Sequence, residues 1–61
     1  MNSEVVKEIN KLQVQKAELK VDLYNVKNDA EADKEEVEEI NKQIAGIEKS
    51  IAQLVHQLKE N

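Results

Sequence analysis

The 61-residue sequence contains no cysteine, proline, phenylalanine or tryptophan, and it has one glycine and one tyrosine. Without cysteine, the chain forms neither a disulfide nor a thiolate metal site. Because tyrosine is its single aromatic residue, a globular core built on aromatic rings is excluded. A chain this short buries little surface alone and often depends on disulfides, metals or self-association. Self-association is therefore the expected supplement to its small core.

Basic clusters and long apolar runs are also absent. The nine basic residues are all lysines scattered along the chain, and thirteen Asp and Glu residues give a net charge of −4. We therefore expect no binding to nucleic-acid phosphate or to an anionic membrane. No apolar run approaches the length of a transmembrane helix, and residues 1–9 do not form a signal peptide. Together with the lack of cysteine, these features predict a cytoplasmic protein.

The sequence does contain an unbroken heptad pattern. If Ile9 is an a position, apolar residues occupy the a and d positions with 4-3 spacing through almost the whole chain. Such sustained spacing predicts α-helices that pair as a coiled coil. Lys16, Ala30 and Asp33 are the weak positions in this pattern. The predicted core seam consists of Val5, Ile9, Leu12, Leu19, Leu23, Val26, Val37, Ile40, Ile44, Ile47, Ile51, Leu54 and Leu58.

The middle stretch, residues 27–36, decides how the helices are connected. It contains two adjacent weak layers, Ala30 and Asp33, and it predicts that the chain turns back on itself. The expected fold is all-α, an antiparallel coiled-coil helical hairpin that forms one domain over residues 1–61. The predicted elements are a helix over about residues 3–27, a turn over about 28–33 and a helix over about 33–59.

In this hairpin, residues whose numbers add up to 63 face each other across the seam. All seven core layers then form, six of them are fully apolar, and the seventh contains Lys16. Lys16 either fixes the register or extends its charged end out of the seam. Asp33 leaves the seam and caps the second helix, with Glu36 completing a capping box. Asn28 and Asp29 are expected to end the first helix.

A single straight helix is the alternative fold. It would be roughly 80 Å long at 1.5 Å per residue, and a parallel coiled-coil dimer would pair Asp22 with Lys27 of the other copy. This arrangement also places Asp33 against its own copy within the seam, where two carboxylates do not both stay ionised readily. A full-length antiparallel dimer is disfavoured because it sets Asp22, Asp29 and Glu36 against one another.

Further apolar residues lie outside the seam, at positions b, e and f. They extend the apolar stripe round one flank of each helix, whereas the other flank, positions c and g, is almost wholly polar. We therefore expect the hairpin to have one weakly apolar side, which predicts dimerisation to a four-helix bundle. The candidate interface consists of Val6, Val14, Ala17, Val21, Tyr24, Ala45, Ala52 and Val55.

No group of residues predicts catalysis or a cofactor. His56 and Glu60 provide only two metal ligands, and the acidic cluster over residues 35–39 lacks the loop of a calcium site. Ser3 and Ser50 have no histidine near them in the pattern, so nucleophilic catalysis has no support. We expect no catalytic residue, metal, cofactor or small-molecule substrate.

The pattern predicts a non-enzymatic protein–protein interaction or oligomerisation module. It is expected to self-associate as a homodimer, or to dock on another protein through its helix faces. One alternative, which follows from the straight helix, is a structural protein that acts as a rod-like coiled-coil spacer. A second alternative, which follows from the net charge of −4, is a small acidic inhibitor or regulator of a basic protein.

Overall fold

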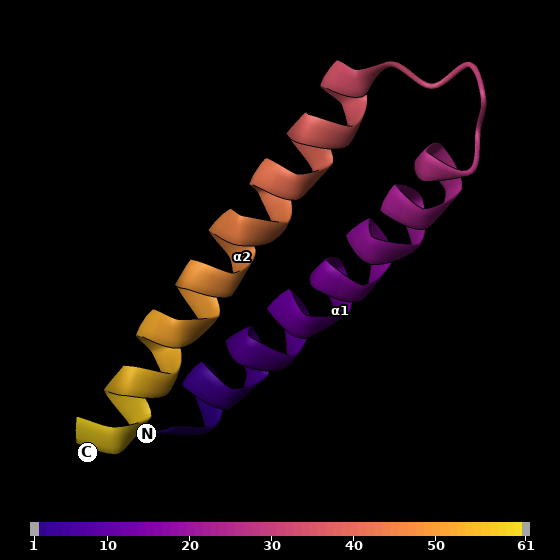
Figure 1. Cartoon of the computed structure of the whole chain (residues 1–61). Helices are drawn as coiled ribbons and strands as arrows, with labels where there is room; N and C mark the ends of the chain where they lie inside the picture. Colours follow the sequence, from indigo (N-terminus) through magenta and orange to yellow (C-terminus); the bar gives the residue numbers. More distant parts are fainter. Residues whose placement is uncertain (1, 61) are drawn as a thin grey trace.

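The computed structural model describes residues 2–60 and contains two α-helices, α1 (Asn2–Lys27) and α2 (Lys34–Glu60). The helices run antiparallel, so the start of α1 and the end of α2 lie at the same end of the molecule (Figure 1). The molecule measures 48 × 14 × 10 Å. The predicted all-α hairpin is confirmed, and the straight helix of roughly 80 Å is not formed. The predicted domain extends one residue beyond the described range at each end.

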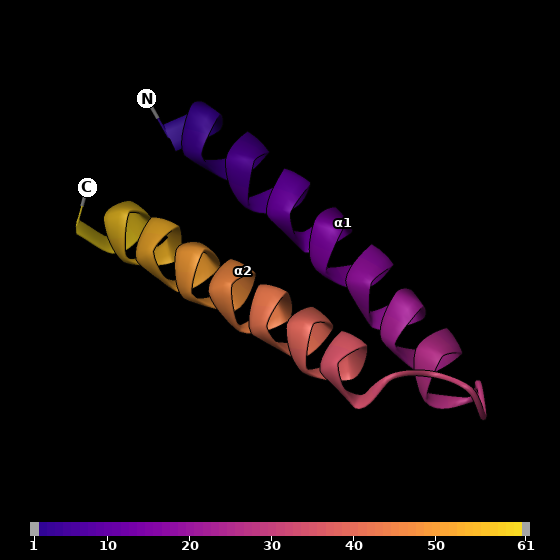
Figure 2. The ribbon, with the colours of Figure 1, turned by 90° about the horizontal axis from the view of Figure 1, so that it is seen from above.

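The two helices pack along the heptad seam and remain together from the open end to the loop (Figure 2). Every a and d position within α1 and α2 is half-buried or buried, whereas Ala30 and Asp33 lie exposed in the loop. Ile44, at 8% exposure, is the one buried residue among residues 2–60. Two helices enclose a seam from two sides only, so the flanks of each layer stay open to solvent.

A side chain caps the end of α1. The Tyr24 carbonyl accepts hydrogen bonds from the backbone N–H (3.1 Å) and the Nδ2 amide (2.8 Å) of Asn28. The Asp29 N–H then donates to the Val26 carbonyl at 3.1 Å, which tightens the last turn. No residue within 2–60 has a positive φ. The helix therefore ends without the left-handed residue that commonly closes a helix, and the Asn28 amide serves instead.

Asp33 caps the start of α2. Its Oδ1 accepts a hydrogen bond from the Glu35 N–H at 3.1 Å, and its carbonyl accepts the Glu36 N–H at 3.0 Å. The predicted capping box is only half formed, because within residues 2–60 the Glu36 carboxylate makes no hydrogen bond back to Asp33. A capping box normally pairs Ser or Thr with Glu, and two carboxylates at one helix start repel each other.

Candidate interaction surface

The outer face of α1 carries a second row of apolar side chains. Val14, Val21 and Tyr24 are 60%, 59% and 70% exposed, and Ala17 between them is exposed as well. Their spacing of three, four and three residues aligns them along one side of a helix. These four residues, Val14, Ala17, Val21 and Tyr24, are called the outer stripe below.

The outer stripe points away from α2. At about 100° per residue, positions f and b lie about 170° and 130° from the middle of the a/d seam. Val14 and Val21 occupy f, and Ala17 and Tyr24 occupy b. The helix α1 is therefore apolar on two nearly opposite faces, and α2 covers only one of them. In contrast, the large apolar side chains of α2 gather on the face that packs against α1.

The eight residues of the candidate interface do not form one continuous side. Val6, which is 43% exposed, and the half-buried Val55 lie near the open end of the hairpin. Ala45 and Ala52 are exposed on α2. Polar side chains at the e positions, such as Lys20, separate these alanines from the outer stripe. Position f lies on the back of the helix, about 100° from position e, so positions b, e and f do not form a single flank.

Lys16 occupies an a position without leaving its charge inside the seam. Its side chain is 23% exposed, and its Nζ lies 3.6 Å from Oε2 of Glu48, which is 55% exposed. This is the one lysine–carboxylate pair that joins the two helices within residues 2–60. The aliphatic part of Lys16 stays in the seam while its ammonium group reaches the e flank. The structure thus shows its charged end extended out of the seam.

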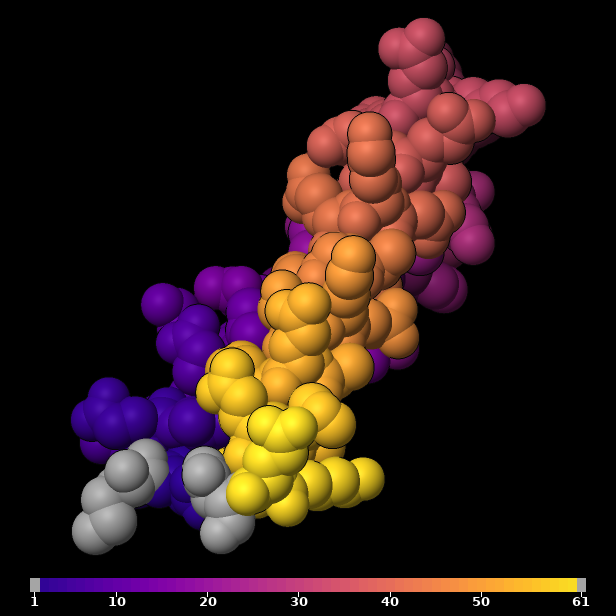
Figure 3. Space-filling view, turned by 90° about the vertical axis from the view of Figure 1, so that its left-hand side faces the viewer, coloured from indigo at the N-terminus to yellow at the C-terminus, as the bar shows by residue number. Residues whose placement is uncertain are grey.

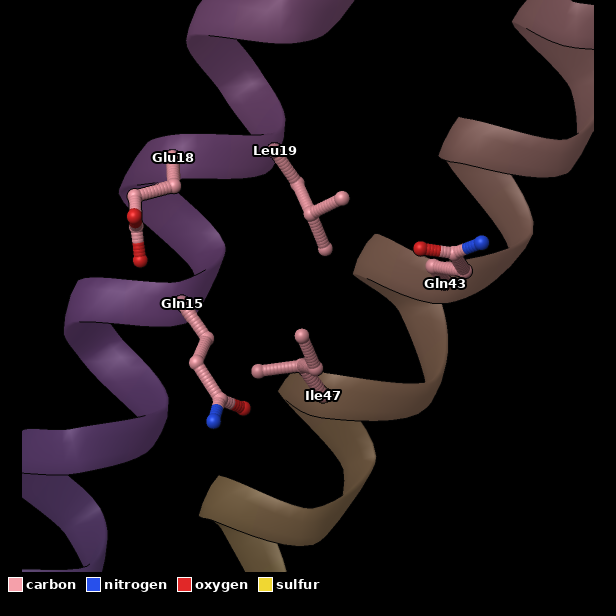
Figure 4. Close-up of a pocket in the computed structure, with 5 residues that line it drawn as sticks. All are labelled: Gln15, Glu18, Leu19, Gln43 and Ile47. Carbon is pink, nitrogen blue, oxygen red and sulfur yellow. The ribbon is translucent and has the colours of Figure 1, made fainter.

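A shallow groove of about 330 Å³ lies on the opposite flank of the hairpin. Leu19 from α1 and Ile47 from α2 point towards each other and form its apolar floor (Figure 4). Gln15, Glu18 and Gln43 form its polar rim. Glu18 is the single ionisable residue among the five, so this set of lining residues holds no acid–base pair and no nucleophile for chemistry.

His56 and Glu60 interact with each other at the end of α2. The Nε2 atom of His56 lies 2.8 Å from Oε1 of Glu60, and both side chains are exposed. Within residues 2–60, no group of three or more His, Asp or Glu residues is placed to hold a metal ion. The acidic residues at positions 35–39 are exposed around the start of α2, where the helix dipole favours negative charge.

Comparisons of this chain with protein-family models, with curated proteins and with solved structures found no match. Over the residues described, neither helix is long and apolar enough to cross a membrane. The outer stripe is an apolar row of the fold that the packing of α1 on α2 leaves exposed.

Proposed function

We propose that this chain is a non-enzymatic protein–protein interaction module that self-associates through the outer stripe of α1. The supporting observation is that Val14, Val21 and Tyr24 stay 60%, 59% and 70% exposed although the a/d seam of the same helix is already covered. A helix in a monomeric hairpin needs one apolar face. A second apolar row at helical spacing fits between the side chains of another helix.

The accessible surface of the hairpin supports the same proposal. It amounts to 4865 Å², whereas a compact monomer of 7.0 kDa is expected to expose about 4,000 Å². The excess arises because two paired helices form a slender rod, which Figure 3 shows from the α2 side. A second copy that covers the outer stripe removes part of this excess without changing the hairpin.

The length of the outer stripe sets the expected strength of the association. The stripe runs from Val14 to Tyr24, which corresponds to about 15 Å of helix. Such a contact buries less than the roughly 1,200 Å² of a stable interface, so we propose a weak and reversible dimer. Tyr24 is the expected anchor, because a tyrosine combines a large apolar ring with a polar end.

The direction of the outer stripe favours a flat row of four helices over the closed four-helix bundle. The seam and the stripe lie about 150° apart on α1, so pairing two stripes leaves each α2 on the outside. In a parallel pair of α1 helices, Gln13 faces Glu18 and Lys20 faces Asn25 of the other copy. An antiparallel pair would set Glu18 against Glu18 and Lys20 against Lys20. We therefore propose the parallel row.

The double variant Val21→Glu/Tyr24→Glu tests the outer stripe. Two carboxylates there should prevent association and leave each hairpin folded, because neither residue belongs to the seam. In sedimentation equilibrium, the wild-type mass should rise with concentration from 7.0 kDa towards twice that value, and the variant should remain at 7.0 kDa. Circular dichroism should report the same helix content for both proteins.

The matched control Asn41→Glu/Gln53→Glu adds the same two charges at exposed positions of α2. It should associate like the wild type, because the proposed row leaves α2 outside the interface. Association of the Val21→Glu/Tyr24→Glu variant at wild-type strength would show that the outer stripe is the wrong surface. A wild-type mass that stays at 7.0 kDa at every concentration would show that self-association is wrong.

The two alternative functions stand on different observations. The spacer requires an uninterrupted helix, and the hairpin interrupts the helix over residues 28–33. The acidic-regulator proposal keeps its basis in the net charge of −4 and in the exposed acidic residues at positions 35–39. Its test is whether captured partners are basic and are released at moderate salt, where charge attraction is screened.

A further inference from the structure

The heptad phase runs through the loop without a break. Val26 is the last d residue of α1, Val37 is the first a residue of α2, and Ala30 and Asp33 hold the a and d positions between them. The loop, residues 28–33, contains no proline or glycine, and no residue within 2–60 has a positive φ. The loop therefore has the heptad length to continue α1 into α2 as one helix, and Ala30, Glu31 and Ala32 favour that helix. Asn28, Asp29 and Asp33 favour the turn instead.

An opened chain can rebuild the same core with a second copy. Facing a and d residues in the hairpin have numbers that add up to 63, as for Leu19 and Ile44. Two opened chains that run antiparallel satisfy the same rule between chains, so each layer of the seam forms twice. This register differs from the antiparallel one disfavoured above, because it sets Asp22 opposite Gln43 and leaves Asp29 opposite Glu36 as its one acidic pair at the g positions. Lys16 then meets Glu48 of the other copy, as it meets its own Glu48 in the hairpin. The packing of the helices is thus equal in both arrangements, and the loop decides between them.

Asn28 and Asp29 hold the loop through hydrogen bonds with the Tyr24 carbonyl and the Glu31 N–H, and Asp33 opposes opening as well. In the hairpin its carboxylate is exposed and accepts the Glu35 N–H. In an opened dimer it would enter the seam opposite Ala30 of the other copy, where it loses both solvent and its capping bond. Asp29 also favours the closed hairpin, because opening would place its carboxylate opposite that of Glu36 of the other copy, and the two negative charges repel each other.

We propose that the a/d seam is an interaction surface for a second copy of this chain, and that Asp33 holds the chain in the closed hairpin. Once the Asp33 carboxylate is removed, two molecules open at residues 28–33 and exchange helices, so that α1 of each packs against α2 of the other. The partner is a second copy because it presents the same layers in the same antiparallel order. This surface is independent of the outer stripe, which stays exposed in both arrangements.

The variant Asp33→Leu tests this role. The leucine removes the cap and the carboxylate, and it offers an apolar d residue to the opened seam. The changes Ser3→Cys and Lys59→Cys provide sites for a donor and an acceptor dye, and labelled protein is mixed with an excess of the same unlabelled variant. Energy transfer then reports the distance between the two ends of one chain.

The two arrangements give opposite results in this experiment. The hairpin keeps the labelled ends together (Figure 1), so the chain with Asp33 gives high transfer. The Asp33→Leu chain should give transfer near zero, because the ends of an opened helix are roughly 80 Å apart. Its mass in sedimentation equilibrium should double from 7.0 kDa.

Two matched variants separate opening from damage to the loop. Asp33→Asn keeps a capping oxygen and offers no apolar side chain, so high transfer should remain. Asp33→Leu/Lys34→Pro should restore high transfer, because proline is accepted at the first residue of α2 and breaks a continuous helix.

High transfer in Asp33→Leu at every concentration overturns the proposal. Loss of helix in circular dichroism overturns it as well, because the seam would then depend on the loop. A dimer formed through the outer stripe has a doubled mass with high transfer, so its presence or absence is read independently. Adding Val21→Glu and Tyr24→Glu to the Asp33→Leu chain should leave the low transfer unchanged.

Discussion

Gly46 lies inside α2 on an exposed part of its surface, and a Cβ added there would meet no atom within 4 Å. Its φ is not positive, so its backbone conformation is open to any residue. Glycine in a helix interior is less favourable than alanine by about 1 kcal/mol. Within the described hairpin, neither packing nor backbone geometry requires a glycine at this position.

The variant Gly46→Ala should raise the free energy of unfolding by about 1 kcal/mol, which corresponds to roughly 4–8 °C in Tm for a domain of this size. Urea and thermal unfolding at a fixed protein concentration measure both quantities. The neighbouring exposed residue provides a matched control, since Ala45→Gly should lower the stability by a similar amount. A lower stability of Gly46→Ala would mean that another molecule packs closely on this part of α2.

Lys16 contributes little through its charge, because its partner Glu48 is 55% exposed and water screens the pair. Replacing Lys16 by Met keeps the buried stem and removes the ammonium group, so Lys16→Met should raise the free energy of unfolding by about 1 kcal/mol. Glu48→Gln should change it by less than about 0.5 kcal/mol. Urea unfolding of both single variants and of the double variant measures the coupling. A coupling well above about 1 kcal/mol would contradict this account.

At the scale of the elements, the start of α2 depends on a side chain and leaves one backbone donor unused. The Glu35 N–H donates to Asp33 Oδ1, whereas within residues 2–60 no hydrogen bond uses the Lys34 N–H. Proline at the first residue of a helix removes only a donor that has no partner there. Lys34 also carries the same charge as Lys27, the last residue of α1.

The variant Lys34→Pro should therefore raise the free energy of unfolding by about 0.5–1 kcal/mol, because it restricts the unfolded chain. A proline one residue later is the matched control. Glu35→Pro removes the N–H that Asp33 binds, so it should lower the stability by about 1 kcal/mol. Urea unfolding distinguishes the two results, and equal effects of both variants would show that Asp33 does not act as a cap.

The two helices follow from the sequence because apolar spacing is a local signal, whereas the sequence favoured the turn over a straight helix without excluding the straight helix. Apolar spacing places the seam, and Asp33 at a d position marks where the seam stops. The candidate interface of eight residues stays a prediction, and helix geometry places its f positions on the back of α1, away from the e flank. The contact between Lys16 and Glu48 depends on how far a flexible side chain reaches across two helices. Heptad positions alone did not decide whether Lys16 fixes the register or extends its charged end out of the seam.

At the scale of the whole molecule, a rod of 48 × 14 × 10 Å exposes a large solvent-accessible area for its mass. Both proposed interaction sites, the outer stripe and the a/d seam, involve a second copy of the chain. The two modes of association differ in whether the hairpin stays closed. Pairing through the outer stripe keeps it closed, and exchange through the seam opens it. A proline at position 34 should block the second process, since it breaks a continuous helix, and leave the first one unaffected.

In the Lys34→Pro background, the Tm should still rise with protein concentration, because any association of the folded hairpin stabilises it against unfolding. A stability gain of about 1 kcal/mol would shift the Tm by roughly 4–8 °C. Adding Val21→Glu and Tyr24→Glu to this background should make the Tm independent of concentration, since both routes of association are then closed. Thermal scans over a wide range of concentrations measure this difference. A concentration-independent Tm in Lys34→Pro alone would mean that the outer stripe serves no second copy.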